Sequence, residues 1–131
     1  MKEKIISIIN QKGGVGKTTT VINLAAGLSL IGKKVLVIDL DPQGNATTGL
    51  GLSNLENSEK SIYSVLNGMK QISDVIEKTK FNNLDLITSN VDLSGLEVET
   101  AGDNRRAFIL KEKLTAYLND SREDYSHILI D

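Results

Sequence analysis

The chain contains no cysteine and no tryptophan, and it has a single proline and a single histidine. Without cysteine, disulfides, thiolate metal sites and cysteine nucleophiles are excluded. The absence is also compatible with a reducing compartment, and we expect a cytoplasmic protein. Aromatic residues make up only 4% of the 131 residues and do not cluster. We therefore interpret Tyr63 as a partly buried helix residue rather than as a base-stacking platform.

Long hydrophobic runs and a large excess of charge are missing as well. No stretch approaches the roughly 20 apolar residues that a membrane-spanning helix needs. The apolar run that follows Lys2 and Lys4 is too short for a secretory signal. A net charge of −2 gives no global attraction to nucleic acid or to an anionic membrane. Length and composition predict one globular domain over residues 1–131.

The glycine-rich segment Gln11 to Thr20 (QKGGVGKTTT) is the most specific motif in the chain. It follows an apolar run, Ile5 to Ile9, and precedes a stretch of helical periodicity, Val21 to Ile31. The predicted order is therefore strand, loop and helix. Glycine lets the backbone come close to a ligand, and inward-pointing amides at a helix N-terminus bind anions. This context predicts a phosphate-binding loop.

Individual residues of this loop receive candidate roles. We expect Lys17 to reach the β- and γ-phosphates of ATP and the Thr18 hydroxyl to hold Mg²⁺. A glycine-rich turn that only caps a helix is the alternative, and the agreement between the motif and its flanking elements disfavours it. The expected nucleotide-binding residues are Lys12, Gly13, Gly14, Val15, Gly16, Lys17, Thr18 and Thr19.

Two aspartates follow the second predicted strand, Val35 to Leu40. Parallel strands of a βαβ unit present their carboxyl ends at one edge of the sheet, so Asp39 and Asp41 should lie beside the phosphate loop. Asp39 either contacts a lysine or threonine of that loop or satisfies loop amides as a buried cap. The segment from Asp41 to Asn45 (DPQGN) has the composition of a turn. Its position after a buried strand favours a functional segment.

The apolar strand His127 to Ile130 ends in Asp131, which is typical of a Walker B motif. Its carboxylate would bind Mg²⁺ through water, close to Thr18. Hydrophobic strands that end in aspartate are common, so the pattern becomes specific only together with the phosphate loop. His127 is the only histidine, and we interpret it as structural because it has no partner for a catalytic dyad.

The form K-G-G-x-G-K-[ST] in this loop resembles the deviant Walker A motif of the ParA/MinD family of ATPases. The usual P-loop pattern has glycine where this chain has Gln11. The resemblance implies that Lys12 crosses a dimer interface and contacts the phosphates of the partner's nucleotide. The segment that begins at Asp41 resembles the family's switch I, whose aspartate organises the attacking water and the Mg²⁺ shell.

The resemblance thus implies which residues act in catalysis and which bind the metal. The implied catalytic residues are Lys12, Lys17 and Asp41. The implied metal residues are Thr18, Asp41 and Asp131.

The resemblance also implies a fold and a function. The fold is α/β, a P-loop NTPase with a parallel sheet flanked by helices, and we expect it to be truncated after the Walker B strand. The function is that of a Mg²⁺-ATP-dependent ATPase that forms a homodimer with ATP and acts in plasmid or chromosome partitioning. Non-specific DNA and a ParB-like centromere-binding protein are the implied partners. The implied location is the bacterial cytoplasm, at the nucleoid if DNA binding holds.

Other functions remain open at this point. A MinD-like cell-division ATPase would be distinguished by an amphipathic C-terminal helix, in a region that we expect to be missing from this truncated chain. The nitrogenase iron-protein branch is disfavoured because its cluster needs cysteines. The chain could also be a non-catalytic fragment that acts only by binding. We expect a truncated gene product, an expressed N-terminal half, or a chain whose missing face is covered by a partner.

The remaining segments carry weaker signals. Glu97 and Glu99 lie two positions apart, and we interpret them as a solvated face rather than as a catalytic pair. The basic residues of the last helix, which are diluted by acidic ones, favour a charged outer face over a DNA site. The other predicted elements are a loop with a short helix at 46–60, a helix at 61–67 closed by Gly68, a weak helix or turn at 73–78, a strand at 84–88, a partly helical stretch at 91–102 and an amphipathic helix at 104–118.

Overall fold

The computed structural model describes residues 4–7, 15–40, 44–51, 61–89, 105–120 and 125–131. The elements in chain order are β1 (Lys4–Ser7), α1 (Val15–Leu30), β2 (Val35–Ile38), α2 (Asn45–Gly49), α3 (Ile62–Leu66), α4 (Ile72–Val75), β3 (Ile76–Lys78), β4 (Leu84–Ile87), α6 (Arg105–Asp120) and β5 (His127–Ile130).

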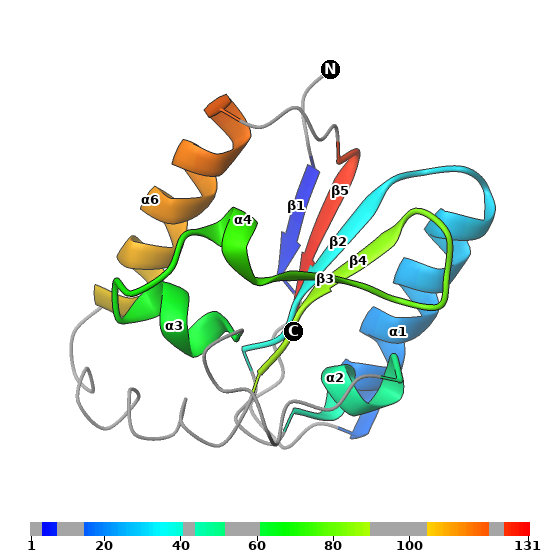
Figure 1. Cartoon of the computed structure of the whole chain (residues 1–131). Helices are drawn as coiled ribbons and strands as arrows, with labels where there is room; N and C mark the ends of the chain where they lie inside the picture. Colours follow the sequence, from blue (N-terminus) through cyan, green and yellow to red (C-terminus); the bar gives the residue numbers. More distant parts are fainter. Residues whose placement is uncertain (1–3, 8–14, 41–43, 52–60, 90–104, 121–124) are drawn as a thin grey trace.

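These strands form one five-stranded sheet in the order β1-β5-β2-β4-β3. The four strands β1, β5, β2 and β4 are parallel, as predicted. The remaining strand, β3, lies at one edge of the sheet and runs antiparallel to its neighbour β4. The chain is thus an α/β fold with a mostly parallel sheet (Figure 1).

The prediction of a weak helix or turn at 73–78 was wrong for the second half of that segment. The short helix α4 ends at Val75, and Ile76 then takes an extended conformation with φ −71° and ψ 127°. Ile76 pairs with Ile87 of β4. A three-residue strand is too short to display a period, so only its pairing with a distant strand defines it.

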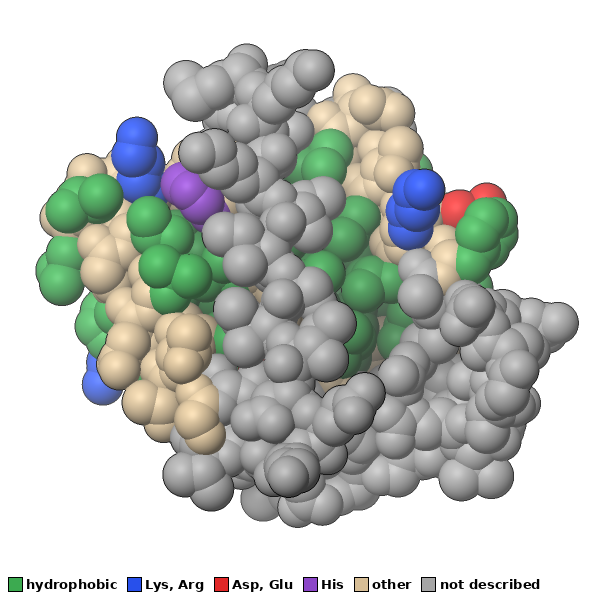
Figure 2. All heavy atoms as spheres, turned by 180° about the vertical axis from the view of Figure 1, so that it is seen from behind, with side chains coloured by type: hydrophobic (Ala, Val, Ile, Leu, Met, Phe, Trp, Pro, Cys, Tyr) green, Lys and Arg blue, Asp and Glu red, His purple; other side chains and the backbone are tan. Residues whose placement is uncertain are grey.

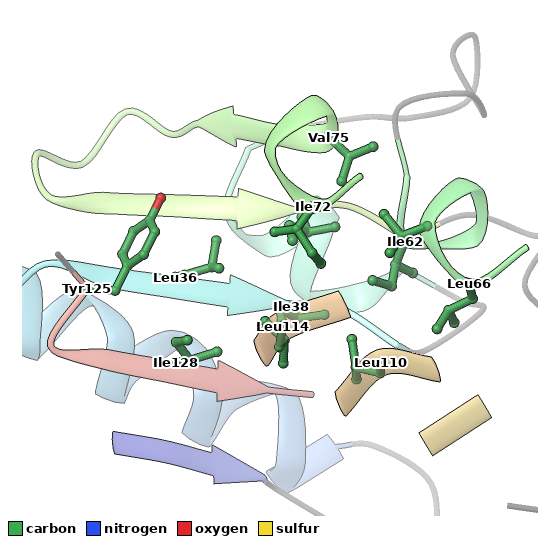
Figure 3. Packing of buried hydrophobic residues seen from close by; sticks show 12 residues of the cluster. Leu36, Ile38, Ile62, Leu66, Ile72, Val75, Leu110, Leu114, Tyr125 and Ile128 are labelled. Atoms are coloured by element: carbon green, nitrogen blue, oxygen red, sulfur yellow. The ribbon is translucent and has the colours of Figure 1, made fainter. Parts of the chain in front are cut away.

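Helices cover both faces of the sheet, with α1 and α2 on one face and α3, α4 and α6 on the other (Figure 1). Side chains alternate along β2 between two clusters. Val35 and Val37 pack in the cluster that contains Val21 and Ala25 of α1. Leu36 and Ile38 pack on the opposite face with residues of α3, α4 and α6 (Figure 3). This double burial explains why the sequence of β2 is a continuous apolar run.

A buried carboxylate interrupts the apolar sequence of β4. Asp85 is 3% exposed and accepts a hydrogen bond of 2.6 Å from the Tyr125 hydroxyl. The ammonium group of Lys78 lies 3.2 Å from the same oxygen. A buried charge without such partners would be costly, so this set satisfies the carboxylate inside the sheet.

Two glycines end helices where the sequence predicted them. Gly32 follows α1 with φ 87°, and Gly68 follows α3 with φ 86°. The Gly32 N–H donates to Ser29 O at 3.1 Å. Only glycine takes this left-handed conformation at low cost, so both predicted helix ends are confirmed.

Other predictions for the helices can be compared with the structure. The amphipathic helix predicted at 104–118 is confirmed as α6, and the short helix within 46–60 as α2. Tyr63 is half-buried on α3 and packs against the hydrophobic cluster, as predicted. The stretch 91–102, with Glu97 and Glu99, lies outside the described residues.

The surface carries scattered apolar side chains. Figure 2 shows hydrophobic side chains on both flanks of the rear face. The large exposed ones among the described residues include Leu30 and Ile31 at the end of α1, and Phe108 on α6. In the part of the chain that the structure describes, no helix has the length and apolar character needed to cross a membrane.

Candidate functional site

The parallel strands end at the same edge of the sheet, next to the start of α1 and to α2 (Figure 1). Backbone pairing continues past the strand ends and fixes the residues that follow. The Asp131 N–H donates to Ile38 O at 2.9 Å, and the Leu40 N–H donates to Asp131 O at 2.9 Å. The Asp39 N–H donates to Ile87 O at 3.1 Å. Asp39 and Asp131 are therefore held in register at this edge.

Thr18 and Asp131 meet there although 113 positions separate them in the sequence. The Thr18 hydroxyl donates a hydrogen bond of 3.2 Å to Asp131 Oδ2. Both residues are buried, at 8% and 5% exposure. A hydroxyl and a carboxylate supply oxygen ligands, which Mg²⁺ prefers, so this pair fits a Mg²⁺ site between α1 and β5. The structure thus brings together two of the three predicted metal residues.

The first turn of α1 adds positive potential beside this pair. The helix begins at Val15 and has no acidic residue in its first turn. Its first amides have no partner within the helix, and the dipole adds positive potential at the same end. A Cβ built on Gly16 would meet nothing within 4 Å. Packing against the described residues therefore does not explain glycine at this position, whereas a closely approaching ligand would.

The other residues of the predicted loop are only partly placed. Thr19 is exposed on the first turn of α1. The side chains of Val15 and Lys17 are not described, and Lys12, Gly13 and Gly14 lie outside the described residues. Their nucleotide contacts remain predictions.

Asp39 is fully buried and caps the N-terminal end of the short helix α2, although it belongs to the end of β2. Its Oδ2 accepts the Thr47 N–H at 2.8 Å and the Thr47 hydroxyl at 2.7 Å. The residue before α2 is Gly44, which has no side chain to satisfy the first amides of the helix. A carboxylate from the preceding strand end takes that role. Asp39 thus acts as a buried cap, one of its two predicted roles, and the amide that it satisfies belongs to α2.

Thr47 and Ser89 complete this arrangement, and neither was predicted as a site residue. The Ser89 N–H donates to the Thr47 hydroxyl at 3.0 Å, and both residues are 3% exposed. Ser89 follows strand β4 almost directly, as Asp39 follows β2. A polar residue just after a buried strand was the available signal for Ser89. Nothing local distinguishes Thr47 from its neighbour Thr48.

Asp41 lies outside the described residues, but both neighbours of its segment are placed. Leu40 is held by its hydrogen bond to Asp131, and Gly44 takes the left-handed conformation with φ 66°. The Gly44 carbonyl accepts the Thr48 N–H at 2.9 Å. Leu40 and Gly44, the described residues on either side of 41–43, therefore lie near the edge of the sheet that carries Thr18 and Asp131. The role of Asp41 stays a prediction.

The weaker candidates receive no support from the described residues. His127 begins β5, at the opposite end of the strand from Asp131, and its Nδ1 lies 3.0 Å from Ser126 Oγ. On α6, the exposed Lys111 stands beside the exposed Glu112, which agrees with a solvated face. The side chains of Arg105 and Arg106 are not described.

The fold and the Thr18–Asp131 pair define a P-loop NTPase. The sequence matches the family described as "AAA domain" over residues 3–131, and the chain belongs to this family. The expected resemblance to ParA-type proteins is confirmed by its relatives. It is 45% identical to sporulation initiation inhibitor protein Soj of Bacillus subtilis, over 98% of this chain and 49% of that protein. It is 43% identical to chromosome partitioning protein ParA of Caulobacter vibrioides, over 98% of this chain and 47% of that protein.

Solved structures show the same relationship. Cobyrinic acid a,c-diamide synthase from Mycobacterium smegmatis, with bound ATP analog and magnesium, superposes with a TM-score of 0.85 and 34% identity, over 99% of this chain and 51% of that one. A plasmid partition protein from Borrelia burgdorferi superposes with a TM-score of 0.82 and 34% identity, over 100% of this chain and 56% of that one. The chain spans about half the length of the relatives it matches.

Proposed function

We propose that this chain binds Mg²⁺-ATP as the nucleotide-binding part of a ParA-type partitioning ATPase. The buried hydrogen bond between Thr18 and Asp131 carries this proposal, because it joins the helix that follows the phosphate loop to the last strand of the sheet. The ATP analog and magnesium bound by the structural relative from Mycobacterium smegmatis support it. The relatives named for chromosome partitioning support the cellular role.

In this proposal Thr18, Asp131 and Asp41 hold Mg²⁺, directly or through water. When bound, the ion supplies positive charge that neutralises the phosphates. The amides at the start of α1 bind phosphate oxygens, and Lys17 binds the β- and γ-phosphates. The Thr19 hydroxyl lies on the same turn and contributes to nucleotide binding.

For hydrolysis, Asp41 positions a water molecule in line with the γ-phosphorus. The water oxygen bonds to phosphorus as the bond to the bridging oxygen breaks, a proton of the water passes to solvent, and ADP and phosphate are released. Lys12 and Lys17 stabilise the charge on the transferred phosphoryl group. A chain that binds ATP but does not hydrolyse it would instead match the alternative of a fragment that acts only by binding.

The proposal includes an ATP-dependent homodimer in which Lys12 reaches the partner's nucleotide. As in the family that the loop resembles, the ATP-bound dimer binds DNA non-specifically and a ParB-like protein stimulates hydrolysis. The proposed location is the bacterial cytoplasm, at the nucleoid when DNA is bound.

Replacing Lys12 with glutamine is expected to separate dimerisation from nucleotide binding. Each of the two lysines in the homodimer would contribute one charge-assisted contact across the interface, of about 1.5–3 kcal/mol, so the dimer should weaken by at least about 100-fold. Light scattering with Mg²⁺-ATP measures this as a lower mass, while ATP affinity changes little. Lys111→Gln, on the exposed surface of α6, is the control. A Lys12→Gln variant that dimerises as the unmodified chain does would refute this role.

Replacing Thr18 with valine tests the metal site. Valine keeps the shape of threonine but loses the hydroxyl that faces Asp131. We expect the Mg²⁺ concentration for half-maximal ATP binding to rise about 10-fold or more, as for the loss of one hydrogen bond to a charged group. Thr20→Val is the matched control, because Thr20 is exposed on the same helix and its hydroxyl donates locally to Gly16 O. An unchanged Mg²⁺ dependence in Thr18→Val would remove Thr18 from the site.

A further inference from the structure

Thr47 is hydrogen-bonded to two neighbouring strand ends at the edge of the sheet. Its hydroxyl donates to Asp39 Oδ2 at 2.7 Å and accepts the Ser89 N–H at 3.0 Å, and its own N–H donates to the same Asp39 oxygen at 2.8 Å. A hydroxyl can donate and accept at the same time, whereas a valine side chain of the same shape can do neither. Thr47 therefore ties the residue that follows β2 to a residue that follows β4.

The residues on either side of Asp39 hold the backbone of Asp131. The Asp131 N–H donates to Ile38 O, and the Leu40 N–H donates to Asp131 O, each at 2.9 Å. The Asp39 N–H is bonded on the opposite side, to the end of β4, at 3.1 Å. The end of β2 thus lies between Asp131 and Thr47 and is hydrogen-bonded to both. The position at which Thr47 holds Asp39 therefore helps to set the position of Asp131.

The helix that carries Thr47 also contacts the helix that carries Thr18. A Cβ added to Gly49 at the end of α2 would collide with Ile22 of α1, so the two helices pack in close contact. Leu50, directly after α2, is 1% exposed and belongs to the hydrophobic cluster on the α1 face of the sheet. A closed path of contacts therefore runs from α1 through α2 and the end of β2 to β5, and the hydrogen bond between Thr18 and the residue after β5 completes it.

Removal of the Thr47 hydroxyl would take one partner from each of two buried groups, the Asp39 carboxylate and the Ser89 N–H. Burial of polar groups that have lost hydrogen bonds is costly, so the strand ends should move to replace them. The packing of Gly49 and Leu50 does not involve this hydroxyl and should keep α2 on α1. The change should therefore be local to the strand ends.

We propose that Thr47 is a positioning residue for the buried pair of Thr18 and Asp131. It holds the end of β2 in the place that keeps the Asp131 carboxylate facing the Thr18 hydroxyl. Thr47 acts through Asp39 and the backbone of β2, and it is not itself a ligand of the ion. This inference rests on the proposed function, because the pair that Thr47 positions is the proposed Mg²⁺ site.

The first test measures the Mg²⁺ concentration for half-maximal ATP binding in the 131-residue chain and in Thr47→Val, Thr47→Ser and Thr48→Val. We expect it to rise about 10-fold in Thr47→Val, at the lower end of the range for residues that orient metal ligands. ATP affinity in the presence of a chelator should change less than about 3-fold, since the start of α1 is intact. Thr47→Ser retains a hydroxyl and should restore most of the Mg²⁺ dependence. Thr48 is the exposed neighbour on the same helix, and its variant should match the unmodified chain.

Amide hydrogen exchange in the chain without nucleotide or metal gives a second readout that does not depend on the ligand. Thr47→Val should speed exchange at Leu40 and Asp131 by at least about 5-fold, as for a hydrogen bond lost by a buried group. Val37, in the middle of β2, should exchange as in the unmodified chain, whereas a general loss of stability would speed all three amides. If Thr47→Val does not fold, Thr47→Ala removes the same hydroxyl with less bulk.

Two results would overturn the positioning role. One is an unchanged Mg²⁺ dependence in the folded Thr47 variant, and the other is exchange at Leu40 and Asp131 that is no faster, relative to Val37, than in the unmodified chain. Failure of the unmodified chain to bind ATP would instead refute the proposed function. The exchange experiment would then still decide whether Thr47 positions Asp131.

Discussion

Replacement of Lys17 with alanine is expected to weaken ATP binding by at least about 100-fold, the largest single effect on affinity that we expect in this chain. The lysine would contact both the β- and γ-phosphates. Each charge-assisted hydrogen bond contributes about 1.5–3 kcal/mol, and two such contacts account for a change of this size. Isothermal titration calorimetry with Mg²⁺-ATP measures it, and turnover should be lost in parallel.

Lys33→Ala is the matched control for this result. Lys33 is exposed just beyond the opposite end of α1, so its loss changes the net charge equally and leaves the phosphate site intact. We expect its ATP affinity to equal that of the unmodified chain. An unchanged affinity and turnover in Lys17→Ala would show that the glycine-rich segment is not a phosphate-binding loop.

Asp41→Ala is expected to leave ATP bound but to lower phosphate release about 10²- to 10⁴-fold, the range for removing a group that activates or transfers a proton of the reacting water. The carboxylate would position the water and would contribute little to the affinity for the phosphates. The ATP-bound dimer should therefore accumulate. A phosphate-release assay together with light scattering measures both effects.

Glu112→Ala controls for the loss of a negative charge, since Glu112 is exposed on α6. Its phosphate release should match that of the unmodified chain. Rapid phosphate release by Asp41→Ala would remove Asp41 from catalysis. A large loss of ATP affinity in that variant would assign it mainly to binding.

Much of the fold could be predicted because its signals are local. The central strands β2 and β5 have apolar side chains buried on both faces of the sheet, and the glycines at 32 and 68 mark helix ends by their backbone conformation. The edge strand β3 was missed for a physical reason. Residues 76–78 are extended because they pair with β4, and such pairing leaves no period in three residues.

Among the site residues, too, some could be predicted from local motifs and others could not. Thr18 and Asp131 could be predicted because each belongs to a motif whose place in a βαβ sheet is fixed, and the carboxyl ends of parallel strands converge. Thr47 could not, because it differs from Thr48 only in facing the sheet. The placement of α2 after Gly44 decides which of the two threonines meets Asp39.

The buried hydrogen bond between Asp85 and Tyr125 could not be predicted for a similar reason, because it depends on a contact that is distant in the sequence. An aspartate within the run LDLI interrupts the apolar pattern of the strand. Its main partner, Tyr125, lies 40 positions away and reaches it only once β5 has crossed to the other side of β2. Sequence patterns locate the strand, whereas the pairing of its buried charge follows from the sheet order.

The central claim is that the buried pair of Thr18 and Asp131 is part of a Mg²⁺-ATP site. Its most direct test is calorimetric titration of ATP into the unmodified 131-residue chain, with Mg²⁺ and with a chelator in its place. The account predicts binding that is tighter with Mg²⁺ by about 10-fold or more, in line with the energy of contacts to a charged group. The absence of binding in both conditions, or an affinity indifferent to Mg²⁺, would contradict it.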